Sequence, residues 1–255
     1  MLVSEIMLQQ TQTSRVIAPW MRFLEQFPTP GDCADASLST VLELWGGLGY
    51  HRRAKALHAA ATMIRDDFTG AVPGDVVSLR LLPGVGEYTA NAVASFAFGL
   101  RVAVLDTNVG RVLARALANR PLGASEARIM ASELLPRGDV GAFNQALLDL
   151  GAQFCKSTPL CASCPVRRSC AWRREGGGDP APNSAGVSRP QSRFAGSNRQ
   201  VRGRVLAILR EGPAAHARLD QSLIDVEVSR RELIVDGLIG DGLVERTGGG
   251  LQLAR

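Results

Sequence analysis

The sequence lacks several features that would place it in other classes of protein. No apolar run reaches the roughly 18 residues that a membrane-spanning helix needs. The start, Met1 followed by Leu-Val-Ser-Glu, has neither the basic residues nor the cleavage site of a secretory signal. There is no internal repeat, and the first 170 or so residues show no alternating strand pattern. We therefore expect a mainly helical cytoplasmic protein with no membrane partner, associated with the nucleoid if its host is bacterial.

Basic residues outnumber acidic ones. The chain has 29 Lys and Arg, most of them Arg, against 24 Asp and Glu, which gives a formal net charge of +5. A modest positive charge favours a polyanionic partner. Arginine pairs at 52–53, 167–168 and 173–174 either contact phosphates or form a solvated face. Hydrophobic residues make up 45% of the 255 positions, enough for a core in one large or two modest domains.

The first half of the chain has helical apolar spacing. Apolar positions and turn residues predict helices over 37–44, 54–67 and 125–135. An earlier helix has a core face predicted from its spacing, formed by Val16, Trp20, Phe23, Leu24 and Phe27.

The stretch 82–90, LPGVGEYTA, is organised around two glycines. Pro83 ends the preceding helix, because proline lacks an N–H and disfavours a helical residue before it. Gly84 and Gly86 allow positive φ and close backbone approach. Their N–H groups, with the start of a helix over 88–98, form an anion site suited to a phosphate. An ordinary turn between two helices explains the same residues, so both interpretations stay open.

Two carboxylates stand where they can serve chemistry. Glu5, in a predicted helix over 4–12, has apolar residues among its neighbours three and four positions away. Burial among apolar groups raises the pKa of a carboxyl and makes it a general acid near neutral pH. An exposed surface glutamate is the alternative, which this stretch alone favours. Asp106 precedes a predicted helix over 108–118, where it is either a catalytic anion or a plain N-cap, and spacing alone favours the cap.

A polar stretch after Glu5 and a later glycine loop carry residues suited to DNA. Glutamine side chains there either hydrogen-bond base edges or fill a gap in a base stack. The loop 46–54, GGLGYHRRA, places an aromatic ring beside two arginines, which suits stacking into DNA. A helix start with a partly buried tyrosine is the alternative. The DNA-contact candidates from these two stretches are Gln9, Gln10, Thr11, Tyr50, His51 and Arg52.

Four cysteines follow with the spacing C-x5-C-x2-C-x5-C, at Cys155, Cys161, Cys164 and Cys170. Such compact spacing without a signal peptide indicates a metal site rather than disulfides. Four thiolates suit either Zn²⁺ or a [4Fe–4S] cluster. Paired CxxC spacing would favour zinc, whereas this single CxxC with long flanks favours the iron–sulfur cluster. Cys33 stands alone, and we predict a small buried residue there.

Several motifs in chain order carry a resemblance to a known family. They are SEIMLQQTQ, LWGGLGY, LPGVGEYTA, LDTNV, FNQALLDLGA and the cysteine run, and they cover roughly residues 1–174. The sequence resembles the MutY family of adenine DNA glycosylases, in the helix–hairpin–helix superfamily that also contains endonuclease III. SEIMLQQTQ and FNQALLDLG are the specific motifs. The resemblance implies a six-helix barrel with the helix–hairpin–helix, plus an iron–sulfur cluster domain with four cysteine ligands.

The resemblance also implies a role for each matching position. Glu5 matches the glutamate that protonates adenine N7 and later handles the water, and Asp106 matches the aspartate that stabilises the oxocarbenium ion or bonds to C1′. Gln10 matches a residue that wedges into the stack beside the orphaned 8-oxoguanine. The remaining matches are Tyr88 and Asn108 as supports of the carboxylates, Gly84, Val85 and Gly86 as the hairpin that holds a backbone phosphate, and the four cysteines as cluster ligands.

The sequence departs from the family pattern in four places. Tyr88 stands where endonuclease III-like enzymes carry a nucleophilic lysine, and tyrosine cannot form a Schiff base, so we expect no β-lyase activity. The first cysteine gap is five residues instead of the usual six. His51 follows Tyr50 where many relatives have a second tyrosine that wedges beside the lesion. The chain begins at the helix of Glu5, where relatives have about one more helix.

Composition changes after the cysteine run. Residues 175–198 have the Gly, Pro and Ser content of a linker. Three predicted helices and a hairpin then indicate a small winged-helix-like α+β domain over 199–255. It either binds DNA through the helix around Arg230 and Arg231 or serves as a packing or partner module. The helices are predicted over 199–211, 219–224 and 229–238, and the hairpin over 243–253.

Together these features predict a monofunctional adenine DNA glycosylase whose catalytic domain spans 1–174. Cleavage of an N-glycosidic bond passes through an oxocarbenium-like transition state, which needs an acid on the leaving base and an anion beside the sugar. The predicted partner is double-stranded DNA with A:8-oxoG or A:G mismatches, bound by a monomer. The alternatives are a thymine or uracil mismatch glycosylase or endonuclease III-like enzyme of the same superfamily, and a truncated non-catalytic DNA-binding protein.

Overall fold

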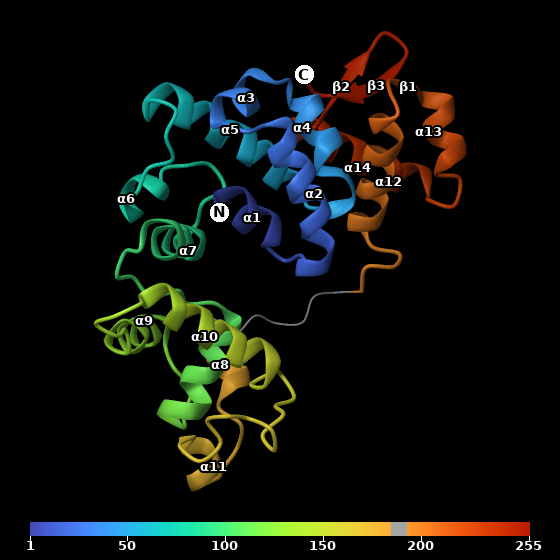
Figure 1. Ribbon diagram of the computed structural model, residues 1–255. Coiled ribbons are helices and arrows are strands. Elements are labelled where there is room, and N and C mark those ends of the chain that lie inside the picture. Colours follow the sequence, from blue (N-terminus) through green and yellow to red (C-terminus); the bar gives the residue numbers. More distant parts are fainter. Residues whose placement is uncertain (185–192) are drawn as a thin grey trace. The chain divides into compact units, whose positions relative to one another are not determined.

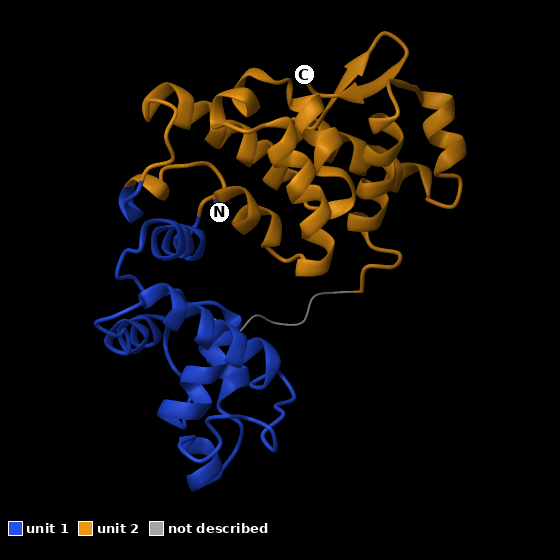
Figure 2. Ribbon diagram, in the orientation of Figure 1, with its two compact units in different colours: residues 1, 74–77, 86–190 blue, residues 2–73, 78–85, 191–255 orange. Residues whose placement is uncertain are grey.

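The computed structural model describes residues 1–184 and 193–255 (Figure 1). The chain divides into two compact units, shown in different colours in Figure 2. Unit 1 comprises residues 1, 74–77 and 86–190, and unit 2 comprises residues 2–73, 78–85 and 191–255. Residues 185–192, part of the predicted linker, lie outside the described residues. In the part of the chain that the structure describes, no helix is long and apolar enough to cross a membrane.

Unit 2 begins with a run of helices in which α5 packs against α3 and α4, burying Trp45 and Ile64. The predicted core face of α2 is largely confirmed, but Leu24 is 36% exposed. Leu24 lies at the edge of that face, because each residue turns a helix by about 100°. These elements are α1 (Leu2–Leu8), α2 (Thr13–Gln26), α3 (Pro30–Asp35), α4 (Leu38–Trp45), η1 (Gly46–Leu48) and α5 (Arg52–Asp67).

The C-terminal residues of unit 2 form three helices and a small antiparallel sheet with strand order β1-β3-β2. The first of these helices buries Val201, Val205 and Leu209, spaced four residues apart on one face. It packs against the last helix and β3, and it also contacts α4 and η1 (Figure 1). The elements are α12 (Asn198–Arg210), β1 (Ala214–Ala215), α13 (His216–Ser222), α14 (Val228–Gly240), β2 (Val244–Thr247) and β3 (Gly250–Leu253).

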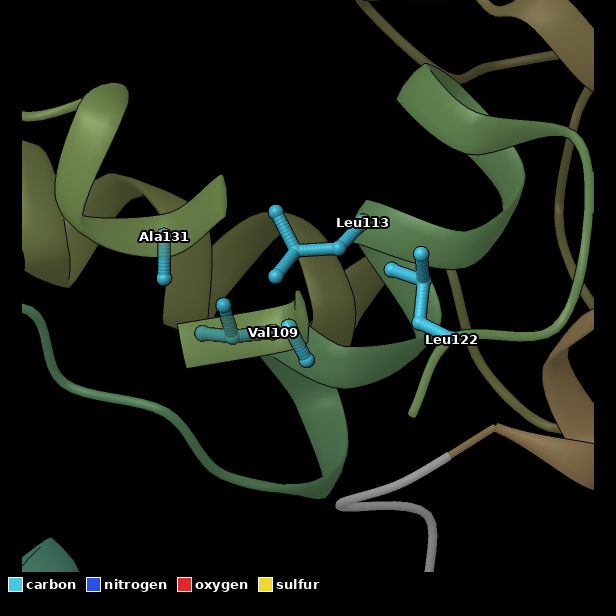
Figure 3. Close-up of a cluster of buried hydrophobic side chains, with 5 residues drawn as sticks. Val109, Leu113, Leu122 and Ala131 are labelled. Carbon is cyan, nitrogen blue, oxygen red and sulfur yellow. The ribbon is translucent and has the colours of Figure 1, made fainter. Parts of the chain in front are cut away.

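The short helix α6 (Val76–Leu79) precedes the glycine hairpin, and α7 (Glu87–Phe98) follows it. Unit 1 continues with helices and the loop before α9, whose buried residues Val109, Leu113 and Leu122 form a hydrophobic cluster with two alanines (Figure 3). The predicted helix over 108–118 is α-helical only in its first half and then becomes a π-helix. The remaining elements are α8 (Thr107–Val112), η2 (Leu113–Ala118), α9 (Ala124–Glu133), α10 (Val140–Gln153), α11 (Ala171–Glu175) and η3 (Ala181–Asn183).

Helix α10 holds the segment that leads into α8. Its buried Asn144 donates to the Val102 carbonyl at 2.9 Å and accepts the Val104 N–H at 3.3 Å. Further along α10, Gly151 faces the backbone of Asn108, since a Cβ at Gly151 would lie 2.5 Å from the Asn108 carbonyl oxygen. Only glycine allows the two helices to approach this closely.

The compact units cut across the predicted domains. Residues 2–73, assigned from sequence to the glycosylase domain, share unit 2 with the winged-helix-like residues 198–255. In addition, part of the predicted linker is packed in unit 1: the Ser184 hydroxyl accepts the Leu122 N–H at 3.2 Å, and Ala181 is buried. The described part of 175–198 is therefore not uniformly a linker.

Candidate active site and cysteine loop

The glycine hairpin uses its two glycines differently. Gly84 has φ +78°, and a Cβ there would lie 2.8 Å from the Cβ of Ala56. Gly86 has φ −85° and open space around its Cβ position, so the expectation of positive φ is met by Gly84 alone. Gly86 is the N-cap of α7, and no side chain caps that helix. The Gln9 amide donates to the Gly84 carbonyl at 3.1 Å, which joins two predicted DNA-contact residues.

Arg53 joins the end of α1 to the glycine loop that precedes α5. Its guanidinium donates to the carbonyls of Ile6 and Met7, both at 2.9 Å, and to the Thr11 hydroxyl at 3.0 Å. It also donates to the Gly49 carbonyl at 3.2 Å. Burial lowers the pKa of Arg53 to about 10. A buried arginine thus satisfies the carbonyls at the C-terminal end of α1 and fixes the candidate residues that follow.

The candidate wedge residues have unusual backbone conformations. Gln10 and Tyr50 both lie in the left-handed region, with φ of 55° and 50°. Non-glycine residues seldom adopt this conformation, and such strain clusters at functional sites. His51 is 8% exposed, and burial, with the nearby charge of Arg210, lowers its pKa to about 4. Its ring is therefore neutral near pH 7, and it lies inside the loop rather than projecting from it.

Asp106 is the N-cap of α8, as spacing alone favours. One carboxylate oxygen accepts the Val109 N–H at 2.8 Å, and the other accepts the Asn108 amide at 2.7 Å. Asn108 in turn accepts Arg111 Nη2 at 2.7 Å, and Arg111 Nε donates to the Cys155 carbonyl at 2.7 Å. Burial raises the pKa of Asp106, and the bonds from Val109 and Asn108 oppose that rise. A hydrogen-bonded chain therefore connects Asp106 to the first cysteine of the cysteine loop.

Glu5 and Tyr88 belong to different units. Glu5 is 8% exposed on α1 in unit 2, so it is buried and is not the surface glutamate that the stretch alone favours. Tyr88 is half-buried in the first turn of α7, in the same unit as Asp106 and Asn108. Within unit 1 the structure brings Asp106 and Asn108 together, and within unit 2 it brings Gln9, Gly84 and the glycine loop together.

The four cysteines line one small cavity of about 20 Å³. Among the described residues, no three His, Cys, Asp or Glu side chains are arranged to hold a metal ion. Zinc needs four ligands converging at about 2.3 Å. By residue type, four cysteines around one cavity suit either a zinc ion or a [4Fe–4S] cluster. Cys33 lies elsewhere and is 3% exposed, which confirms that it is a buried core residue.

Arg115 organises the cysteine loop from a fully buried position. Its guanidinium forms two hydrogen bonds with Asp179, at 2.8 and 2.6 Å, and donates to the Ser157 carbonyl at 3.1 Å. Its Nη1 lies 3.6 Å from Cys155 Sγ, and its guanidinium carbon lies 5.5 Å from the centre of the Trp172 ring. Burial raises the pKa of the Cys155 thiol, and Arg115 opposes this, so its charge favours a thiolate.

Comparison with known proteins identifies the family. Residues 3–137 match the HhH-GPD superfamily of base excision DNA repair proteins. An adenine DNA glycosylase of Mycobacterium tuberculosis is 45% identical over 96% of this chain and 82% of its own length. The adenine DNA glycosylase of Mycolicibacterium smegmatis is 43% identical over 98% of this chain and 85% of its own length. The chain belongs to the adenine DNA glycosylases of the HhH-GPD superfamily.

Solved structures of other HhH-GPD proteins have the same fold. A thermostable thymine-DNA glycosylase matches 68% of this chain and 83% of its own with a TM-score of 0.63 and 28% identity. An endonuclease III trapped in a covalent DNA intermediate matches the same shares with a TM-score of 0.61. Both confirm the predicted mainly helical glycosylase fold, and the predicted C-terminal hairpin is also present.

Sequence reasoning missed the arginines that build this HhH-GPD site. Arg53, Arg111 and Arg115 hold the glycine loop, Asn108 and the cysteine loop, respectively. The sequence could have indicated a buried Arg115, because it is the one charged residue in the apolar stretch 112–118. Conversely, Arg230 and Arg231, proposed as DNA contacts, bond to Asn198 and Asp220 within the same unit. These bonds favour the packing interpretation of that helix.

Proposed function

We propose that this chain hydrolyses the N-glycosidic bond of adenine opposite 8-oxoguanine or guanine in double-stranded DNA, and that it works as a monomer. It is a base-excision-repair DNA glycosylase acting on adenine, in keeping with 43–45% identity to adenine DNA glycosylases over nearly the whole chain. The proposal adds the identity of the base opposite adenine, which is 8-oxoguanine or guanine.

Two carboxylates share the chemistry. The C1′–N9 bond breaks with its electron pair leaving on adenine, while Glu5 delivers a proton to N7. Asp106 stabilises the positive charge that develops on the sugar, as an anion must in an oxocarbenium-like transition state. Water then attacks C1′ and gives its proton to Glu5. The adenine must first leave the duplex, which costs a few kcal/mol of stacking and pairing.

The observation that carries the assignment is the fixed carboxylate of Asp106. The Val109 N–H and the Asn108 amide both donate to it, and Arg111 holds Asn108 in turn. These donors favour the ionised form and oppose the rise in the pKa of Asp106 that burial causes. Asn108 thus acts as a positioning residue for Asp106. We assign Tyr88 a supporting role, and without a lysine at that position the enzyme is monofunctional.

The proposed DNA contacts lie on two elements of unit 2 and the start of α7. The strained Gln10 and Tyr50 enter the base stack, and the hairpin around Gly84 holds a backbone phosphate. The full set of proposed contacts is Gln9, Gln10, Thr11, Tyr50, Arg52, Gly84, Val85 and Gly86, and the buried His51 is left out of it.

We propose that Cys155, Cys161, Cys164 and Cys170 hold a [4Fe–4S] cluster. All four line one cavity, and Arg115 places a positive charge beside Cys155. When bound, the cluster links the 155–170 loop through its iron–sulfur bonds and has a structural role. Its readout is independent of activity: the purified chain should absorb broadly in the visible blue and contain about four irons. Cys161→Ser should lose the iron, whereas the core variant Cys33→Ala should keep it. Colourless protein with one zinc would contradict this proposal.

The test of the function is base release from matched duplexes carrying A:8-oxoG, A:G, A:T or T:G. We expect adenine release from the first two, none from A:T, and no thymine release from T:G. Borohydride should trap no covalent adduct, because Tyr88 supplies no amine. Thymine release, or a trapped adduct on abasic DNA, would support the thymine glycosylase or endonuclease III-like alternative instead.

A further inference from the structure

Unit 2 contains a groove of about 830 Å³ between the glycine loop and α12. Its walls come from the end of α1, from residues 46–53 and from one face of α12, with the exposed ring of Phe194 at the rim. No acidic residue is among the described residues that line it. The arginines that line it are Arg15, Arg52, Arg53, Arg199, Arg202 and Arg210.

Three of these arginines, Arg15, Arg53 and Arg210, are held by backbone carbonyls that leave their charge uncancelled. Arg15 donates to the Gly47 carbonyl at 2.6 Å, and Arg210 donates to the Gly46 carbonyl at 3.1 Å. Arg199 donates to the Tyr50 hydroxyl at 2.6 Å. Carbonyls and hydroxyls orient a guanidinium but carry no net charge. One carboxylate, that of Asp241, pairs with both Arg52 and Arg202. The groove therefore keeps a large positive charge.

The charge acts on a group in the wall of the groove. His51 lies in its wall, and after burial the charges of Arg210, Arg202 and Arg53 each lower the pKa of its ring. A concave surface with one sign of charge concentrates its field and attracts polyanions. The volume exceeds what a single phosphate needs, which favours an extended anionic strand.

We propose that this groove binds the phosphate backbone of the DNA substrate, and that α12 of the C-terminal segment supplies half of the contacts. The inference rests on the proposed function, because it takes DNA as the polyanion. Arginine is suited to phosphates, which it binds through two parallel N–H donors. Tyr50 and Phe194 provide aromatic faces for stacking at the same groove. The C-terminal segment thus binds DNA through α12, whereas the arginines of α14 are engaged within the unit.

The test is the salt dependence of duplex binding by the full chain. Loss of one phosphate contact should reduce the slope of log Kd against log salt by about 0.9. We expect this change, with several-fold weaker binding, in Arg199→Gln and in Arg210→Gln. The matched control is Arg204→Gln, on the same helix and with the same loss of charge. Arg204 faces Asp225 with two bonds of 2.7 Å and does not line the groove, so its slope should equal that of the wild type.

Binding is measured on an undamaged duplex as well as on an A:8-oxoG duplex, and melting temperatures show which variants are folded. Folded Arg199→Gln and Arg210→Gln proteins with wild-type slopes on both duplexes would overturn the inference, even if adenine is released normally. If the variants have altered salt slopes but the wild-type chain releases no adenine, the groove still binds DNA and the proposed function is wrong. If Arg210→Gln fails to fold, the salt slope of Arg199→Gln alone decides whether the groove binds the DNA backbone.

Discussion

At the scale of single residues, Asp106 caps α8, and we propose that it also supplies the catalytic charge, although spacing alone presents the two roles as alternatives. Its carboxylate caps α8 through Val109 and also accepts the Asn108 amide. Capping and catalytic charge are compatible, because a cap needs only an acceptor whereas the transition state needs a negative charge. Sequence spacing identified the position. It could not show Asn108 and Arg111 behind it, because those contacts depend on how α8 packs against α10.

The Asn108→Ala variant tests that arrangement through pH. Burial raises the pKa of Asp106, and the Asn108 amide opposes that rise by favouring the ionised form. Its removal should raise the pKa further, so the acid limb of the single-turnover rate should move to higher pH. The rate well above that limb should change less. An unchanged limb with a uniformly lower rate would mean that Asn108 does not act through Asp106.

A second residue-scale prediction concerns the buried charge in the cysteine loop. Asp179→Asn leaves the guanidinium of Arg115 buried without its carboxylate partner. The free energy of unfolding should fall by about 2–3 kcal/mol, below the 3–5 kcal/mol of fully buried pairs, because the Asp179 side chain is 29% exposed. Denaturant unfolding measures this, and Asp66→Asn in the exposed pair with Arg65 serves as control, with a much smaller change. Equal losses in the two variants would contradict the role assigned to Arg115.

At the scale of elements, helix positions were predictable because their ends carry local signals. Ser37 caps α4 and Gly99 ends α7 in the left-handed conformation, as their residue types indicate. The π-helix η2 and the two-residue strand β1 were not foreseen. Each depends on tertiary contacts: η2 carries the buried Arg115, and β1 exists only by pairing with β3.

The approach of α10 to α8 gives a prediction with a matched control. Gly151→Ala places a methyl group 2.5 Å from the Asn108 carbonyl oxygen, so α8 must shift and carry Asp106 with it. Stability should fall by about 1–3 kcal/mol, and adenine release should slow. Gly141→Ala lies on the same helix, where the nearest atom is a side-chain oxygen at 3.4 Å, and it should be neutral or stabilising by up to about 1 kcal/mol. Similar behaviour of the two variants would show that the close approach is unimportant.

At the scale of the whole molecule, the motifs predicted the family, but the predicted domains do not coincide with the compact units. The hydrophobic pattern places α12 in a C-terminal domain, yet its arginines reach the glycine loop near the start of the chain. Such long-range polar contacts leave no periodic trace in a sequence. The same limit applies to Arg53, which joins α1 to α5 across more than 40 positions.

The central claim is that a glutamate of unit 2 and an aspartate of unit 1 divide the acid and anion roles. The most direct measurement is single-turnover adenine release by Asp106→Asn and Glu5→Gln on an A:8-oxoG duplex, beside a binding isotherm for each. Asparagine keeps the cap but not the charge, and glutamine keeps the shape but cannot deliver a proton. Excision should fall by about 10²–10⁴ in each variant while DNA binding persists or tightens. Near-normal excision by folded Asp106→Asn would leave Asp106 as a cap only and contradict the account.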